Sequence, residues 1–181
     1  MLTAATRLFR RQGYAATGWR EVVAEGEAPW GSQAHHFPGG KEQLAGEALA
    51  REGERMRRRI EAGLERWHPA EMIRRWGIVA AAELEASAWA EGCPIATTAL
   101  ETAHASDALA EVCHGAFTSW QVTLTDAMTA RGVPAREARS RAALVIASTE
   151  GSLLLARAAH DAAPLKAVTR ELSRTLRERV P

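Results

Sequence analysis

Two short segments of this chain, 101–104 and 111–114, both read Glu-x-x-His, a spacing that helical bundles use to bind a pair of metal ions. Such a site also needs carboxylates from neighbouring helices, and the sequence identifies none. His35 and His36 are adjacent, so on a helix their side chains point about 100° apart and do not converge on one ion. We therefore expect no bound metal, no cofactor and no enzyme activity. A helical-bundle metalloenzyme stays as an alternative.

Residues 29–44 have the composition of a short DNA-reading helix followed by a corner and a long helix. Pro29 suits a first helical position, because its missing N–H costs nothing there. Small and polar residues follow, and the Pro-Gly-Gly corner at 38–40 stops the helix. A helix that enters the major groove needs small residues for close approach and polar side chains near its N-terminal end. This pattern predicts double-stranded DNA as a partner. The alternative for the histidine pair is that it caps the helix end and packs on Phe37.

Composition indicates a helical protein and gives little sign of a partner. The 181 residues are 46% hydrophobic and include one Tyr and three Phe, which favours helix over strand. No apolar run approaches the roughly 20 residues of a membrane span. Cys93 and Cys113 are too few for a disulfide framework or a zinc cluster, so we expect a cytoplasmic location. The net charge of +1 is low for a DNA-binding protein, because neutralised phosphates supply much of the affinity.

Helical periodicity, interrupted by Gly and Pro, predicts an all-α chain. Gly13 should end the first helix, and Thr17 should cap the second. The expected helices cover residues 1–12, 17–24, 29–36, 41–67, 70–90, 94–104, 106–130, 135–160 and 164–179. We expect a DNA-binding domain at 1–45 and a ligand-binding and dimerisation domain at 46–181, which divide inside the long helix.

Four segments, spread over nearly the whole chain, carry a family resemblance. They read Ala-Ala-Thr-Arg-Leu-Phe followed by Gly-Tyr-Ala-Ala-Thr at 4–17, His-His-Phe-Pro-Gly-Gly-Lys-Glu-Gln-Leu at 35–44, Glu-Gly-Cys-Pro-Ile-Ala at 91–96 and Glu-Gly-Ser-Leu-Leu-Leu-Ala-Arg at 150–157. In this order they resemble the TetR family of transcriptional regulators, in its LmrA/YxaF-like branch. The resemblance implies a helix-turn-helix head, a helical body around a small-molecule pocket, and a homodimer. It also implies a repressor that its ligand releases from a palindromic operator.

The resemblance also assigns the operator contacts. They fall on Thr17, Arg20, Trp30, Gly31, Ser32, His35, His36 and Lys41. Three residues depart from the family pattern: Ala34 replaces a tyrosine that commonly contacts DNA, Gln33 replaces an apolar packing residue, and Glu27 places an anion near phosphate. These departures predict a weakened or unusual operator preference. They also agree with an alternative interpretation, in which the protein binds a small molecule but has lost operator binding.

Aromatic residues of the second domain are candidates for a ligand pocket. At helical spacing such residues are ordinarily core, but the resemblance indicates a cavity lined by Met72, Trp76, Trp89, Phe117 and Trp120. Glu83 and Glu85 lie on the same predicted helix, and a buried carboxylate there would favour a cationic planar ligand. The alternative for both is a solvated helix face. We expect a hydrophobic or cationic aromatic effector.

The last two predicted helices carry apolar stripes. One stripe contains Val145, Ser148, Ser152 and Leu155, and the other contains Leu165, Val168, Leu172 and Leu176. The chain's own core could account for them. Their place at the end of the chain, in the order of the family's dimer helices, favours an isologous dimer interface.

Overall fold

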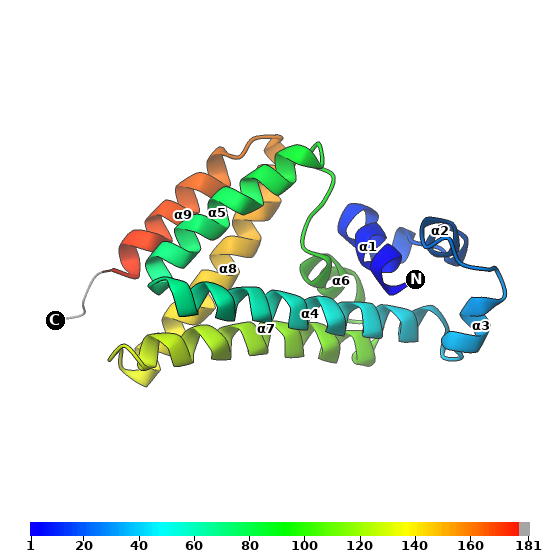
Figure 1. Ribbon diagram of the computed structural model, residues 1–181, viewed down its shortest axis with the longest axis horizontal. Coiled ribbons are helices and arrows are strands. Elements are labelled where there is room, and N and C mark those ends of the chain that lie inside the picture. The colour runs from blue at the N-terminus through cyan, green and yellow to red at the C-terminus, as the bar shows by residue number, and fades with distance from the viewer. Residues whose placement is uncertain (178–181) are drawn as a thin grey trace. The chain divides into compact units, whose positions relative to one another are not determined.

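The computed structural model describes residues 1–177, which form nine α-helices and no strand (Figure 1). The all-α prediction is confirmed, and most helix ends agree with the predicted ones to within a few residues. The predicted end of the last helix, Arg179, lies outside the described residues. The helices are α1 (Leu2–Ala16), α2 (Trp19–Glu25), α3 (Ser32–His36), α4 (Gly40–Arg66), α5 (Pro69–Ala86), α6 (Pro94–Thr102), α7 (Asp107–Thr129), α8 (Ala135–Ala159) and α9 (Ala163–Thr175).

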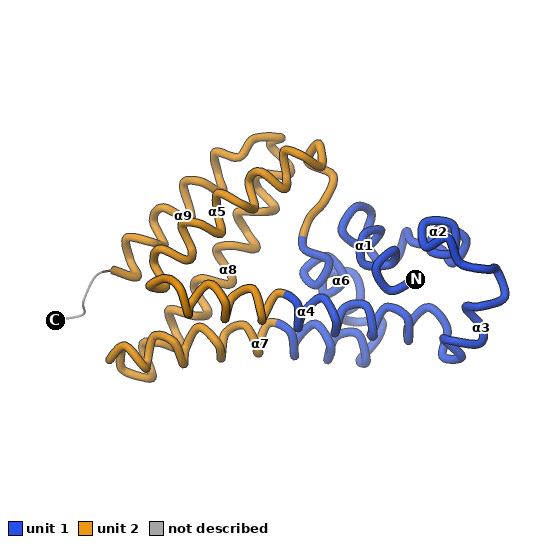
Figure 2. The backbone as a smooth tube through the Cα atoms, in the orientation of Figure 1, with its two compact units in different colours: residues 1–55, 93–116 blue, residues 56–92, 117–181 orange. Residues whose placement is uncertain are grey.

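The helices form two compact units, each built from two separate stretches of sequence (Figure 2). Unit 1 contains residues 1–55 and 93–116, and unit 2 contains residues 56–92 and those from 117 onward. The units do not follow the predicted division at residue 45. The reason is that α6 packs against α1, which brings residues 93–116 into the same unit as the N-terminal helices. The functional division at 1–45 and 46–181 stays a prediction.

Unit 1 has a core in which α1, α4, α6 and α7 share fully buried side chains. They are Ala5, Phe9, Leu44, Leu49, Ile95 and Leu109. The predicted stop at Gly13 is present as a break inside α1, where Gly13 takes a left-handed φ of 84°. A side chain there would collide with Glu101 of α6, whose Oε1 lies 2.0 Å from the position that a Cβ would occupy. Glycine therefore permits both the turn of the chain and the close approach of α6.

Unit 2 is a bundle in which α9 packs against α5 and α8. The buried residues Ala80, Ala81, Leu84, Ala156, Ala162 and Leu165 form one cluster in it. Small side chains at these contacts let the helices approach closely. On α7, Trp120, Leu124 and Met128 are buried and belong to the core.

Candidate nucleic-acid interface and ligand cavity

The start of α2 differs from the sequence prediction. Its N-cap is Gly18, one residue later than predicted, and the Gly18 N–H donates to Glu21 Oε2 at 2.9 Å. Thr17 is only 1% exposed, and its hydroxyl donates to the Gly13 carbonyl at 2.7 Å. The Thr17 side chain therefore stabilises the turn between α1 and α2. The prediction that it contacts DNA is wrong, because the side chain is buried. Arg20, the second residue of α2, is exposed.

The candidate reading helix, α3, begins at Ser32 and not at Pro29 as predicted. Both the backbone N–H and the hydroxyl of Ser32 donate to the Pro29 carbonyl, at 2.9 and 2.7 Å, which closes a turn before the helix begins. Glu27, the residue flagged as a departure from the family pattern, takes a left-handed φ of 48° where the chain leaves α2. Trp30 and Gly31 therefore lie on an exposed turn ahead of α3.

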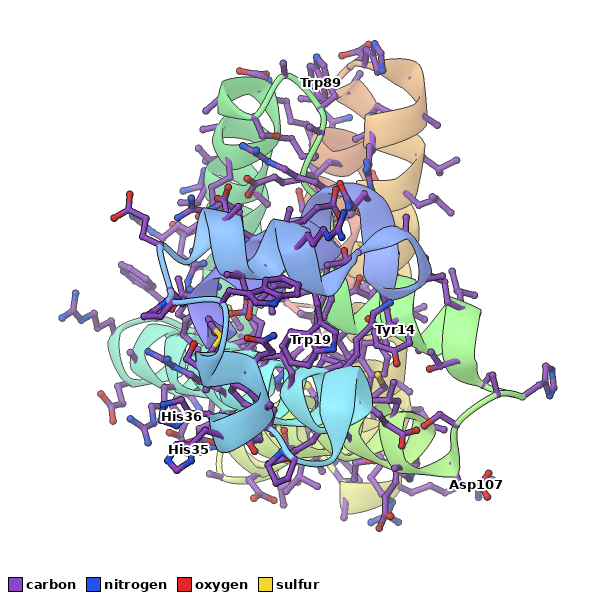
Figure 3. The ribbon with its side chains drawn as sticks, turned by 90° about the vertical axis from the view of Figure 1, so that its right-hand side faces the viewer. Tyr14, Trp19, His35, His36, Trp89 and Asp107 are labelled. Atoms are coloured by element: carbon purple, nitrogen blue, oxygen red, sulfur yellow. The ribbon has the colours of Figure 1, made fainter. Side chains whose placement is uncertain are left out.

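One face of α3 is open to solvent. None of the five residues of this fully described helix is buried, and Ala34, His35 and His36 are exposed. The two imidazole rings lie 5.1 Å apart, edge to face, and project outward from α3 (Figure 3). Behind the helix, the buried Phe37 ring packs 6.1 Å from the Trp19 ring of α2. This packing anchors α3 from one side and leaves the other side free.

Gln33 destabilises the packing of α3, because part of its polar side chain is buried without a partner. It is half-buried, and its side-chain oxygen is buried without a hydrogen-bond donor among residues 1–177. An unpaired buried polar group costs about 1–3 kcal/mol. An apolar residue at this position would avoid that cost, so α3 is held less firmly here than a hydrophobic anchor would hold it.

Lys41, in the first turn of α4, folds back over the α1–α2 corner. Its Nζ lies 4.2 Å above the Tyr14 ring and 3.4 Å from the Ala15 carbonyl oxygen, to which it donates. Partial burial lowers the pKa of Lys41, and the nearby carboxylates of Glu101 and Glu21 oppose that shift. The ammonium therefore lies over the α1–α2 corner, between the Tyr14 ring and the Ala15 carbonyl oxygen.

Three interactions that the sequence did not predict hold the helices of unit 1 together. Glu101, considered above only for its Glu-x-x-His spacing, accepts a hydrogen bond from the Ala15 N–H at 2.9 Å. The Ser106 hydroxyl donates to the Glu42 carboxylate of α4. Both contacts join residues more than 60 positions apart, so no local pattern could have revealed them. Within residues 1–177, no group of three or more His, Cys, Asp or Glu side chains could hold a metal ion.

The third interaction is an ion pair inside unit 1. The buried Glu52 carboxylate accepts from Arg10 at 2.5 Å and from Arg55 Nε and Nη2, both at 2.7 Å. Burial alone would raise the pKa of Glu52, but the hydrogen bonds and charges of Arg55 and Arg10 outweigh it and hold the pKa below its ordinary value of 4.5. The pair therefore ties α1 to α4 with a charged carboxylate.

We expect Glu52→Gln to lower the free energy of unfolding at neutral pH by about 2 kcal/mol, because it leaves two guanidinium groups without their shared charge. Since the folded-state pKa is lowered, the contribution of Glu52 is present above pH 4.5 and is lost as pH falls through the folded pKa. Urea unfolding at several pH values tests this. The difference between wild type and variant should shrink in acid, and a difference independent of pH would contradict the argument.

Unit 2 contains a small cavity of about 40 Å³ between four helices. Its wall consists of Met56 and Ile60 from α4, Met72, Ile73 and Trp76 from α5, Trp120 and Leu124 from α7, and Val145, Ile146, Thr149 and Glu150 from α8. Space of this size holds only a few water molecules. A larger ligand would have to displace lining side chains, and methionine is the side chain that adapts most readily.

Three of the five predicted pocket residues, Met72, Trp76 and Trp120, line this cavity, whereas Trp89 and Phe117 do not. Phe117 packs edge to face against Trp120 with their ring centres 5.3 Å apart, so it supports a lining residue. Trp89 lies past the end of α5 in a left-handed conformation with a φ of 64°. Its ring stacks on His160. The chain turns at the end of α5 and thereby carries Trp89 to the end of α8, which corrects its predicted place.

Neither Glu83 nor Glu85 lines this cavity. Both are exposed, and they lie 3.4 Å from Arg59 and 3.7 Å from Lys166, respectively. For both residues the solvated helix face, given above as the alternative, is the correct interpretation. The carboxylate in the cavity wall is that of Glu150, on α8.

The predicted dimer residues differ in how deeply they are buried within the single chain. Five of them, Val145, Ser152, Leu165, Leu172 and Leu176, are buried within the single chain. For these five, the chain's own core is the correct account, because α9 packs against α5 and α8. Ser148 and Val168 are half-buried, and Leu155 is exposed.

A different set of α8 side chains forms an exposed apolar face. Its large members are Leu144, Leu154 and Leu155, and Ala147, Gly151 and Ala158 lie between and beyond them. We call these six residues the α8 outer face. Within residues 1–177, α8 is also the single helix long and apolar enough to cross a membrane by length and composition alone. This finding qualifies the expectation drawn from the sequence, which identified no such stretch.

Two family models match this chain, one in its N-terminal part and one in the part that follows. Residues 1–48 match the family of bacterial regulatory proteins of the tetR type, and residues 69–171 match the C-terminal domain of LmrA/YxaF-like transcriptional regulators. The HTH-type regulator LmrA of Bacillus subtilis is 37% identical over 166 residues, 91% of this chain and 88% of LmrA. YxaF of the same organism is 32% identical over 180 residues, 99% of this chain and 94% of YxaF.

A solved structure agrees with this fold. A regulatory protein TetR from Rhodobacter sphaeroides superimposes with a TM-score of 0.85 at 19% identity and covers 96% of this chain and 95% of its own. This agreement shows that the two proteins share one fold. The chain therefore belongs to the TetR family of DNA-binding transcriptional regulators, in the LmrA/YxaF-like branch, and is not an enzyme.

Proposed function

We propose that this regulator is a homodimeric repressor that binds a palindromic operator through α3 and leaves it when an effector enters the unit 2 cavity. The observation that carries operator binding is the open face of α3, on which Ala34, His35 and His36 are all exposed. Short side chains and imidazole donors suit close approach to base edges and phosphates. Such a regulator acts on DNA in the cytoplasm.

The proposed contacts to DNA are those predicted side chains that remain accessible: Arg20, Trp30, Ser32, His35, His36 and Lys41, with Gly31 allowing close approach of the backbone. Two copies would read two half-sites about 34–36 Å apart, one helical turn of DNA. The α8 outer face, with its exposed leucines, supports pairing of two chains. Ser148 of α8 and Val168 of α9, both half-buried, would complete the interface.

We propose a hydrophobic or cationic aromatic effector for the cavity lined by Met72, Trp76 and Trp120. Because the cavity holds only about 40 Å³ of space, an aromatic molecule would have to push apart side chains of α4, α5, α7 and α8. A ligand can release the operator only if it binds one conformation of the dimer better than the other. Expansion of this small cavity would supply such a difference.

The double substitution His35→Ala/His36→Ala should lower operator affinity about tenfold to a hundredfold, since each lost contact to a base or phosphate costs about 1 kcal/mol or more. The measurement is an electrophoretic mobility shift with DNA from beside the protein's own gene. His104→Ala is the control, because His104 is an exposed histidine on the α6–α7 connection, and it should leave the affinity unchanged.

A second candidate function, an effector-binding protein without operator binding, is supported by the unpaired Gln33 oxygen and the inward Thr17 hydroxyl. The same mobility shift distinguishes the two. Retention of the wild type on its neighbouring DNA, and release on adding an aromatic ligand, supports the repressor. No retention of the wild type in low salt, where phosphate contacts are strongest, supports the second candidate.

A further inference from the structure

The stretch that contains the candidate reading helix lacks the side chains that most often read guanine. Residues 21–40, which include α3 and the turn before it, contain no Lys and no Arg. In the commonest base-specific contact, a Lys or Arg side chain donates to O6 and N7 of guanine. The nearest basic residues, Arg20 and Lys41, lie outside α3, on α2 and in the first turn of α4. No cationic side chain of α3 is therefore available to recognise guanine.

Two apolar side chains occupy the exposed surface of this stretch. Ala34 is exposed in the middle of α3, at the position where the family pattern has a tyrosine. Trp30, on the turn before α3, is 56% exposed, although tryptophan is among the side chains that are highly buried on average. The surface that would approach a base pair is therefore partly apolar, and its charge does not come from α3.

The backbone places these two residues about one helical turn apart. The Ser32 N–H donates to the Pro29 carbonyl at 2.9 Å, and Gly31, inside that turn, has the helical dihedral angles φ −77° and ψ −11°. The chain therefore already turns in the helical sense before α3 begins. Residues four positions apart on a helical backbone are neighbours on one face. We call Trp30 and Ala34 the apolar strip.

An apolar side chain in the major groove can distinguish one base from the other three. Thymine carries a C5-methyl group on its major-groove edge, and alanine and aromatic side chains contact it. The imidazoles of His35 and His36 can donate to N7, but adenine and guanine both present N7 as an acceptor. The Ser32 hydroxyl already donates to the Pro29 carbonyl at 2.7 Å. Discrimination by α3 therefore depends on the apolar strip more than on its polar side chains.

Resting on the operator binding proposed above, we propose that the apolar strip recognises thymine methyl groups, so that A·T pairs occupy the positions that Trp30 and Ala34 face in each half-site. The Ala34 Cβ packs against one methyl group, and the Trp30 ring covers the methyl group of a neighbouring thymine. A cytosine in place of thymine lacks the methyl group and presents its N4 amino donor to an apolar side chain. That donor loses water without gaining a partner, which lowers affinity.

The test removes the methyl groups without changing any hydrogen-bonding group of the DNA. Footprinting on DNA from beside the protein's own gene locates the half-sites, and deoxyuridine then replaces their thymidines one at a time. A mobility shift measures the affinity of the wild type for each duplex. We expect a loss of about fourfold for each methyl group that the apolar strip covers, which is the effect of burying one such group. Deoxyuridine in the flanking DNA should leave the affinity unchanged.

Two variants assign the effect to the apolar strip. In Ala34→Gly and Trp30→Ala the partner of one methyl group is removed, so each variant should lose the preference for thymidine over deoxyuridine at its own position and keep it at the other. Ala108→Gly, an exposed alanine at the start of α7, is the matched control and should keep both preferences. Ala34→Ser, which keeps the size of the side chain but adds a hydroxyl, serves if glycine loosens α3. Circular dichroism melting reports whether each variant is folded.

The outcomes separate this proposal from the function on which it rests. If the wild type binds its DNA specifically but every thymidine can be replaced with less than a twofold loss, methyl recognition is wrong while operator binding stands. If deoxyuridine weakens the wild type and both variants equally, other residues sense the methyl groups and the assignment to Trp30 and Ala34 is wrong. If the wild type binds no DNA even in low salt, operator binding itself is wrong, and the proposal with it.

Discussion

Replacing Leu144 and Leu155 by glutamate should convert the proposed dimer to a monomer and abolish tight binding to the proposed operator. The two leucines are 47% and 57% exposed and lie eleven residues, or about three helical turns, apart on the α8 outer face. In an isologous interface both copies use the same face, so the two substitutions would place four carboxylates in one apolar contact.

The expected loss of operator affinity is roughly a hundredfold or more, because a monomer binds one half-site without the second to hold it. Sedimentation velocity gives the oligomeric state, and a mobility shift gives the affinity. Leu100→Glu is the matched control, since Leu100 is a leucine of α6 that is 82% exposed and lies in unit 1. A double variant that stays dimeric, or a control that becomes monomeric, would show that α8 does not form the interface.

Gly77→Ala should destabilise unit 2 strongly, although alanine is the better helix former. A Cβ at Gly77 of α5 would lie 2.3 Å from Thr169 Oγ1 and 2.8 Å from its Cβ and Cγ2. Thr169 is buried and β-branched, and its hydroxyl is held by the Leu165 carbonyl at 2.8 Å, so it has little room to move. Overpacking of this kind costs about 1–3 kcal/mol or more. We expect a net loss of about 2 kcal/mol, or roughly 4–8 °C in Tm.

The control for this prediction is Gly115→Ala on α7, where, apart from the chain neighbours and the adjacent backbone of α7 itself, no atom of the described residues lies within 4 Å of the added Cβ. That substitution should stabilise the protein by about 0.5–1 kcal/mol through helix propensity alone. Adding Thr169→Ala to Gly77→Ala should recover part of the loss, because it removes two of the three colliding atoms. Calorimetric melting of the four proteins tests this. Equal effects at Gly77 and Gly115 would mean that α5 and α9 are not in close contact.

The order and kind of the helices were predictable from the sequence alone. Periodic apolar residues, the glycine at 13, the corner at 38–40 and the prolines at 69, 94 and 134 mark helix ends, because backbone geometry at Gly and Pro is a local property. The family, too, was identified from short segments. The start of α3 was not predicted correctly. The sequence places it at Pro29, but Ser32 donates to the Pro29 carbonyl and closes a turn there, so that the helix begins only at Ser32.

Only the tertiary structure decided what each helix face does. Periodicity shows that Val145 and Leu155 lie on apolar parts of one helix, yet Val145 is buried in the chain's own core and Leu155 is exposed. The same holds for charge: Glu83 and Glu85 are solvated, whereas Glu150 borders the cavity. The spacing of residues along a helix determines which side chains share a face, but which face meets another helix depends on contacts between residues far apart in the chain. For that reason the helices could be predicted, and the choice between core, cavity and free surface could not.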